Sequence, residues 1–280
     1  MKSGYKKIIT TFAGRQDRMG FLANYTKKAL DQNIVDEWHI WDFARNDKDK
    51  AWLKTLPSLS NKIKLFASVD YGQPDMSLAS WEPYYSHYTL DKYLEETIII
   101  RMDDDIVYFD VDKLKDFIEF RINNTEPFII SANVINNGVC AGIQTQRGVL
   151  EKNIYPPEGL PYVPYESCCG VLWSNGRLAE SVHEYFIKNI ESFKQMTGVH
   201  KQPAGERISI NCISYLGKDF KYTKSITRDE EHVISAVLSG QLQRNNLVYL
   251  PFIASHLSFY KQEETGFDSH KILNLYKTLL

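Results

Sequence analysis

Apolar and polar residues alternate along the first half of the chain in blocks that predict strands separated by helices. Short runs rich in β-branched and aromatic residues predict strands at residues 7–12, 38–43, 63–67 and 97–102. After Gly14 breaks the first run, Leu22, Tyr25 and Ala29 follow at helical spacing. Strands that alternate with helices are typically joined by crossover connections. The pattern therefore predicts an α/β fold with a mixed, mainly parallel sheet flanked by helices.

The second half of the chain continues the alternation less regularly. Helical patterns are expected at residues 48–56, 81–94, 112–121, 177–193 and 208–215. Further strands are expected at residues 128–132, 220–225 and 247–253. The segment 136–170 is rich in Gly, Pro and Asn, which predicts that it is mostly loop. No internal repeat and no convincing linker divides the chain, so we expect a single domain.

Composition and charge exclude several classes of protein. Apolar residues make up 43% of the 280 residues, enough to bury a large core and to exclude wholesale disorder. Lys and Arg number 33 against 35 Asp and Glu, a formal charge of −2. Nucleic-acid binding that depends on phosphate neutralisation normally needs a basic excess or a concentrated basic face, so we expect no nucleic-acid partner.

The chain shows no sequence signal for membrane insertion or export. No apolar stretch approaches the roughly 18 to 20 residues that cross a bilayer, and the apolar run at residues 8–12 is too short for a signal peptide. Four cysteines without CxxC spacing predict neither a zinc motif nor a disulfide framework, so a reducing cytoplasm is expected. Residues 267–280 predict an amphipathic helix that either docks on the core or makes peripheral membrane contact.

Three consecutive aspartates follow the most strongly β-forming run of the chain, residues 97–102. In open α/β sheets ligands collect at the carboxyl ends of strands, and three adjacent carboxylates repel one another unless a cation neutralises them. Asp103 and Asp105, at i and i+2, can converge on one divalent ion. The alternative is a solvated turn after a strand. Apolar runs on both sides of the cluster favour an interior edge and therefore a metal site.

This arrangement resembles the metal-dependent GT-A glycosyltransferases, in which a DxD motif ends a central strand and holds a nucleotide sugar through a divalent ion. The resemblance covers the element order of nearly the whole chain. It implies one GT-A-like, Rossmann-like domain at residues 1–280, with a nucleotide-binding half at 1–110, an acceptor-binding half at 111–260 and a helical tail at 261–280. The chain is similar in this respect to bacterial surface-polysaccharide transferases.

The resemblance also implies the partners and the donor-binding residues. We expect a nucleotide-sugar donor, with a UDP-sugar favoured, a saccharide or glycoconjugate acceptor, and inversion at the transferred sugar. Arg15, in TTFAGRQDR, would reach a phosphate, and Asp42 would contact the base or ribose; surface roles are the alternatives for both. The residues implied to bind the donor are Thr11, Phe12, Ala13, Arg15, Asp42, Arg101, Asp103 and Asp104.

His256 follows an apolar run late in the chain, where many members of the resembled family supply a further metal ligand. The implied metal ligands are therefore Asp103, Asp105 and His256. A mixed carboxylate and imidazole shell suits Mn²⁺ better than Mg²⁺, so manganese is expected first. The alternative is a structural histidine held by hydrogen bonds.

Inversion needs a base for the acceptor hydroxyl, normally a carboxylate. The segment ITRDEEHVISAVLSGQ supplies Asp229, Glu230 and Glu231 in the first turn of a predicted helix. Thr227 and Glu230 have capping-box spacing, which would hold Glu230 at the cap and favour its two neighbours, although the choice stays open. The alternative is that these acids only complement the helix dipole. Glu206, at another predicted helix start, is a second candidate base.

Two rival functions remain at this level. A phosphotransferase of the haloacid dehalogenase type also places DxD after a strand, but it requires a DxDxT/V pattern near the amino terminus, whereas DDDIV comes a third of the way along this chain. A non-catalytic module that binds a nucleotide sugar is the other rival. Metal-dependent hydrolysis of a UDP-sugar would separate the enzyme from the module.

Overall fold

The computed structural model describes residues 4–66, 82–154, 170–223, 226 and 229–280 and places nine strands in one mixed sheet. The strands are β1 (Lys6–Ala13), β2 (Glu37–Asp42), β3 (Ile63–Phe66), β4 (Thr97–Met102), β5 (Ile106–Phe109), β6 (Ile130–Ile135), β7 (Val199–Gln202), β8 (Cys212–Leu216) and β9 (Asn246–His256). Their order is β3-β2-β1-β4-β8-β6-β9-β5, and β7 pairs with β9. The first four run parallel to one another and to β6 and β9, whereas β5, β7 and β8 run in the opposite direction. The predicted mixed, mainly parallel α/β sheet is therefore confirmed.

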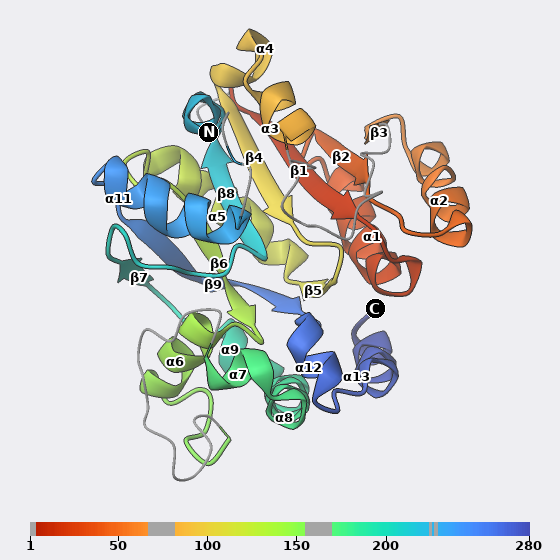
Figure 1. Cartoon of the computed structure of the whole chain (residues 1–280), viewed down its shortest axis with the longest axis vertical. Coiled ribbons are helices and arrows are strands. Elements are labelled where there is room, and N and C mark those ends of the chain that lie inside the picture. The colour runs from red at the N-terminus through yellow and green to blue at the C-terminus, as the bar shows by residue number, and fades with distance from the viewer. Residues whose placement is uncertain (1–3, 67–81, 155–169, 224–225, 227–228) are drawn as a thin grey trace.

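Helices connect the strands and cover the sheet (Figure 1). Those in the first half are α1 (Gln16–Asp31), α2 (Asp47–Leu53), α3 (Glu82–Tyr88), α4 (Asp91–Leu94), α5 (Val111–Asn123) and α6 (Gly138–Gln146). Those in the second half are α7 (Val171–Ser174), α8 (Gly176–Lys188), α9 (Ile190–Lys194), α10 (Glu230–His232), α11 (Ser239–Gln241), α12 (Tyr260–Glu264) and α13 (Ser269–Tyr276). A π-helical segment, Val233–Leu238, joins α10 to α11, and short 3₁₀ turns lie at Leu56–Leu59, Gly217–Tyr222 and Lys277–Leu279.

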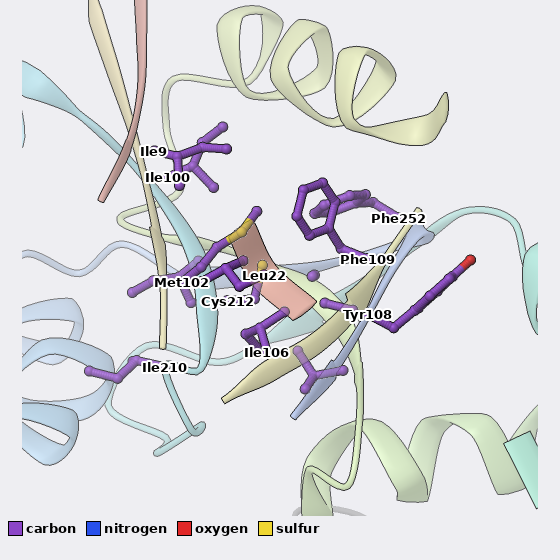
Figure 2. Packing of buried hydrophobic residues seen from close by; sticks show 14 of the residues in the cluster. Ile9, Leu22, Ile100, Met102, Ile106, Tyr108, Phe109, Ile210, Cys212 and Phe252 are labelled. Carbon is purple, nitrogen blue, oxygen red and sulfur yellow. The ribbon is translucent and has the colours of Figure 1, made fainter. Parts of the chain in front are cut away.

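The central strand predicted at residues 97–102 is β4, and every one of its residues is buried. It lies between β1 and β8, so both of its edges are paired. Its apolar side chains join one hydrophobic cluster with residues of β5 and α1, for example Ile100, Phe109 and Leu22, which Figure 2 shows packed together. Because β4 is buried on both faces, its carboxyl end has a fixed position in the sheet. Asp103, the first residue of the acidic cluster, follows directly.

Two predictions for the second half were wrong, and one helix was not predicted. Residues 208–215 form no helix, because Cys212–Leu216 pairs antiparallel with both β4 and β6, and Ile208, Ile210 and Cys212 follow the two-residue period of an extended chain. Residues 220–222 belong to a 3₁₀ turn rather than a strand. The segment 136–170, predicted to be mostly loop, contains the nine-residue helix α6; residues 155–169 lie outside the described part of the chain.

The carboxy-terminal tail docks on the core, as the first of its two predicted alternatives states. In α13 the apolar side chains of Ile272, Leu273 and Tyr276 are buried, and the helix packs on α8 and β5. In Figure 1, α13 lies beside α12 and α8 below the sheet. Among the described residues, none of the helices has the length and apolarity to span a membrane.

Candidate active site

The acidic cluster and His256 meet at the carboxyl ends of two strands. Asp103, Asp104 and Asp105 form the link between β4 and β5, and His256 is the last residue of β9. Donor atoms of Asp103, Asp105 and His256 all lie within 4.8 Å of one another. All three side chains line a cavity of about 300 Å³. One nitrogen and two carboxylate oxygens at this separation can hold a divalent ion.

The pairing of β5 with β9 explains why residues so distant in sequence converge. The two strands are antiparallel, and Ile106 is the register partner of His256. The N–H of Leu257 donates a hydrogen bond to the carbonyl oxygen of Asp105 at 2.9 Å. The backbone therefore fixes His256 beside Asp105, and the His256 Nε2 atom lies 3.3 Å from Asp105 Oδ1.

Two arginines at the start of α1, one helical turn apart, form ion pairs with the acidic cluster. Arg15 Nη2 lies 2.6 Å from Asp104 Oδ1 and 2.9 Å from Asp105 Oδ2. Arg18 Nη1 lies 3.7 Å from Asp105 Oδ2, and the same guanidinium pairs with Glu263 of α12. Asp104 is thus directed toward α1 and away from the cluster formed by its two neighbours.

Gly14 permits this close approach of β1 to the acidic cluster. Its N–H donates to Asp104 Oδ2 at 2.9 Å. A Cβ atom at this position would lie 3.2 Å from the same oxygen and 3.3 Å from the carbonyl oxygen of Phe43. A larger residue would therefore push the strand end away from Asp104.

Asp103 and Asp105 have opposite protonation tendencies. Burial raises the pKa of Asp103 to about 6, against the opposing effect of Arg101, whose Nη2 lies 3.2 Å from Asp103 Oδ1. Burial also acts to raise the pKa of Asp105, but His256 and Arg15 outweigh it and hold that pKa below its usual range. Asp105 is therefore the permanently charged member of the pair at neutral pH, and a bound cation would favour the charged form of Asp103 as well.

The lining of the cavity carries an excess of negative charge. Three arginines and five carboxylates face it, together with His256. The Nδ1 atom of His256 is buried and has no hydrogen-bond partner among the described residues. An imidazole with one unpaired nitrogen, grouped with surplus carboxylates, is a donor set that a divalent cation satisfies, so the residues present fit a metal ion.

Glu230 also lines the cavity, where one cationic and one aromatic residue, Arg101 and Tyr85, hold its carboxylate. Arg101 Nη1 lies 2.9 Å from Glu230 Oε1, and the hydroxyl of Tyr85 donates to the same oxygen. Burial raises the pKa of Glu230, although Arg101 and Tyr85 act in the opposite direction. A buried carboxylate with a raised pKa and one anchored oxygen is a recurring form of general base.

The other candidate bases are placed differently. Glu231 lines the cavity and accepts from Arg207 Nε at 2.9 Å. Asp229 is outside the cavity lining; it is the N-cap of α10, accepts from the His232 N–H and is paired with both Nη atoms of Arg207. The predicted capping box was wrong in its register, because the cap is Asp229, and Thr227 lies outside the described residues. Glu230 is therefore not held at a cap.

Glu206 does not line the cavity and accepts a hydrogen bond from Gln202 Nε2 at 3.1 Å. The predicted helix that would have presented it is absent, because an extended segment leading into β8 follows it. No observation here supports Glu206 as a base.

Of the residues predicted to bind the donor, five line the cavity and three are buried beside it without lining it. Phe12 and Arg15 line the cavity, together with Arg101, Asp103 and Asp104. Thr11 and Ala13, the alternate residues of β1, are buried; Thr11 Oγ1 accepts from Trp38 Nε1, and the Ala13 carbonyl accepts from the Phe43 N–H. Asp42 is also buried and accepts from the Ala44 N–H, so it shapes the turn that presents Phe43 and Arg45 to the cavity.

Several residues of the site were not predicted from the sequence. Arg18 carried a signal, because it follows Arg15 at a spacing of three on a predicted helix. Tyr85 and Asn211 carried none, since each comes from an element whose position beside β4 depends on tertiary structure. Asn211 Nδ2 donates to Asp103 Oδ2 at 3.1 Å. Phe259, which packs on the His256 ring with centroids 4.4 Å apart, is likewise a finding of the structure.

Comparison with known proteins gave matches only among solved structures. No family model and no curated protein sequence matches the chain. It is similar to residues 1–349 of S. aureus TarS at 12% identity and a TM-score of 0.46, over 90% of this chain and 60% of that one. It is similar to a CMP:2-keto-3-deoxy-manno-octonic acid synthetase complexed with CTP at 8% identity and a TM-score of 0.47, over 99% and 100% of the two chains.

A third similar structure is the galactosyltransferase LgtC in complex with donor and acceptor sugar analogs. The identity is 9%, the TM-score is 0.34, and the match covers 97% of this chain and 95% of that one. All three TM-scores are below 0.5.

Proposed function

We propose that the protein is a metal-dependent glycosyltransferase that moves a sugar from a nucleotide-sugar donor, with a UDP-sugar expected, to an acceptor hydroxyl. The observation that carries the proposal is the convergence of Asp103, Asp105 and His256 in a cavity that also holds a buried carboxylate, Glu230. Departure of a nucleoside diphosphate needs a cation, and inverting attack by a hydroxyl needs a base. One cavity holds both a cluster that can bind the cation and a carboxylate that can act as the base.

Asp103, Asp105 and His256 would hold the metal ion. Mn²⁺ is the preferred ion because the donor set mixes oxygen and nitrogen, and Mg²⁺ is the second choice. When bound, such an ion neutralises charge on a departing diphosphate. The protein contributes to the same task through Arg15, which lines the cavity as the N-cap residue of the 16-residue helix α1, where anions are favoured by the helix dipole.

Glu230 is the proposed base. Its Oε1 atom is held by Arg101 and Tyr85, and Oε2 has no hydrogen bond or ion pair with the described residues. The anchored oxygen fixes the orientation of the carboxylate, which leaves the second oxygen to accept the proton of an acceptor hydroxyl. Glu231 lines the same cavity and is the runner-up, whereas Asp229 lies outside the lining and caps α10.

The test is hydrolysis of nucleotide sugars by the purified full chain. UDP-, GDP- and CMP-sugars are supplied with Mn²⁺, with Mg²⁺ or with chelator, and release of the free nucleotide is measured. Metal-dependent release of UDP supports the proposal. Binding of UDP-sugar without any turnover or transfer would favour the non-catalytic module, and release of inorganic phosphate from phosphate monoesters would favour a phosphotransferase.

A further inference from the structure

Two consecutive asparagines, Asn136 and Asn137, follow β6 and lie next to the metal-binding cluster without belonging to it. Both side chains are fully or almost fully buried, with 0% and 1% exposure. Neither lines the cavity. Buried amides are retained where each polar atom has a defined partner, so the partners show what the pair holds in place.

Asn136 is hydrogen-bonded to the residue that follows His256. Its Nδ2 atom donates to the carbonyl oxygen of Leu257 at 3.0 Å. The same carbonyl accepts from Nε2 of the fully buried His183 at 2.8 Å, and the Leu257 N–H donates to the Asp105 carbonyl. Leu257, the residue after His256, is therefore held through both its N–H and its carbonyl, which fixes the backbone beside the imidazole.

The amide of Asn136 is itself held by a reciprocal pair of hydrogen bonds. Its Nδ2 donates to Gln262 Oε1 at 2.9 Å, and its Oδ1 accepts from Gln262 Nε2 at 2.8 Å. Asn136 has a positive φ of 64°, a conformation that asparagine tolerates better than most residues. The left-handed turn directs the two adjacent asparagines to different partners.

Asn137 is linked to Asp103 through the side chain of Asn211. Its Nδ2 atom lies 3.4 Å from Asn211 Oδ1, and Asn211 Nδ2 donates to Asp103 Oδ2 at 3.1 Å. The backbone strengthens the link, because the Asp103 N–H donates to the Asn211 carbonyl. Asn137 Oδ1 meanwhile accepts from the Cys140 N–H as the N-cap of α6. One end of α6 is thus connected to the first ligand of the cluster.

We propose that Asn136 and Asn137 are positioning residues for the metal site, holding His256 through the Leu257 carbonyl and Asp103 through Asn211. This inference rests on the proposed function. Groups that orient metal ligands in this way affect metal affinity without touching the ion, commonly by 10- to 100-fold. Two residues adjacent in sequence would then control ligands that come from two different strands.

The test is titration calorimetry of Mn²⁺ into the full-length protein in the presence of UDP. Asn136→Gly keeps the positive φ accessible and removes the amide, and Asn137→Ser keeps a good N-cap and removes the donor to Asn211. Each substitution is expected to weaken Mn²⁺ binding about tenfold. The matched controls are Asn33→Gly, at another positive-φ asparagine, and Asn175→Ser, at the N-cap of α8; both are expected to leave Mn²⁺ binding unchanged.

The outcomes separate the two proposals. If the wild-type protein binds Mn²⁺ and both site variants bind it equally well, the positioning role is overturned and the proposed function stands. If Mn²⁺ binding is weakened equally in the site variants and in their controls, the positioning role is also overturned, because the loss would not be specific to Asn136 and Asn137. If the wild-type protein binds neither Mn²⁺ nor UDP, the proposed function fails. Should Asn136→Gly not fold, the milder Asn137→Ser decides the result alone.

Discussion

Arg101 and Glu230 form a buried ion pair in which Nη1 lies 2.9 Å from Oε1 and each side chain is 7% exposed. The pair connects the carboxyl end of the central strand β4 with the first residue of α10. Because Arg101 also contacts Asp103 and lies over the Phe12 ring, one cation joins the proposed base to the proposed metal site. Burial makes this pair sensitive to the loss of either partner.

Replacing Arg101 with Gln is expected to destabilise the protein by about 3 to 5 kcal/mol, because Glu230 would be left buried without its cation. Urea denaturation at pH 7 measures the change. Lys27→Gln, which breaks the exposed pair between Lys27 and Asp31, is the control and is expected to cost less than about 1 kcal/mol. A loss for Arg101→Gln no larger than that of the control would show that the buried pair contributes little.

Glu230→Gln is expected to lower the transfer rate by about 10²- to 10⁴-fold, the usual contribution of a general base. The amide keeps an oxygen that accepts from Tyr85, so binding of the donor is expected to persist. Transfer is measured with the acceptor present, and donor binding by calorimetry on the same sample. Full transfer activity in this variant would remove Glu230 from the role and turn attention to Glu231→Gln.

Asp229→Asn provides the contrasting variant in the same turn of α10. Asparagine is as good an N-cap as aspartate, so the helix start is preserved. Because Asp229 lies outside the cavity lining, transfer is expected to stay near the wild-type rate. A loss comparable to that of Glu230→Gln would contradict the assignment of the base.

Stability is expected to fall as the pH is lowered from 7 to 5, in part through His183. Burial lowers the pKa of His183 to about 3, and both ring nitrogens are occupied, Nδ1 by the Tyr276 hydroxyl and Nε2 by the Leu257 carbonyl. Protonation near the ordinary pKa of about 6.5 then occurs only in the unfolded chain, so stability is fully present above that pH and is lost below it. The loss at pH 5 is about 2 kcal/mol for this residue.

Urea denaturation at pH 7 and at pH 5 tests the contribution of His183. His183→Gln is expected to be less stable at pH 7 but to lose less stability between the two pH values than the wild type. His270→Gln, at an exposed histidine of α13, is the control and is expected to keep the wild-type dependence. An unchanged dependence in His183→Gln would assign the acid sensitivity to other groups.

The sequence correctly predicted those helices and strands whose pattern of apolar residues matches the way they are buried in the fold. The run at residues 97–102 is apolar throughout because β4 is covered on both faces, and α5 and β9 likewise followed their periodicity. The strand β8 was missed because the polar residues that precede it, such as Asn211, resemble those of a helix start. The helix α6 was missed because Gly138 and Gly142 weaken the helical signal that Asn137 begins.

The chemistry of the site was easier to predict than its geometry. Asp103 and Asp105 have a position in the sequence that already indicates the carboxyl end of a strand. That His256 reaches them depends on the pairing of β5 with β9, which no local pattern specifies. The roles of the buried asparagines Asn136 and Asn137 follow from tertiary packing alone.

The most direct test of the metal site is the binding of UDP to the full-length protein, measured by titration calorimetry with Mn²⁺ and again with a chelator. Tight binding with Mn²⁺ that is lost in the chelator, and lost also in Asp105→Asn and His256→Ala but not in His270→Ala, is the result that this account predicts. Equal binding of UDP in Mn²⁺ and in chelator would contradict it.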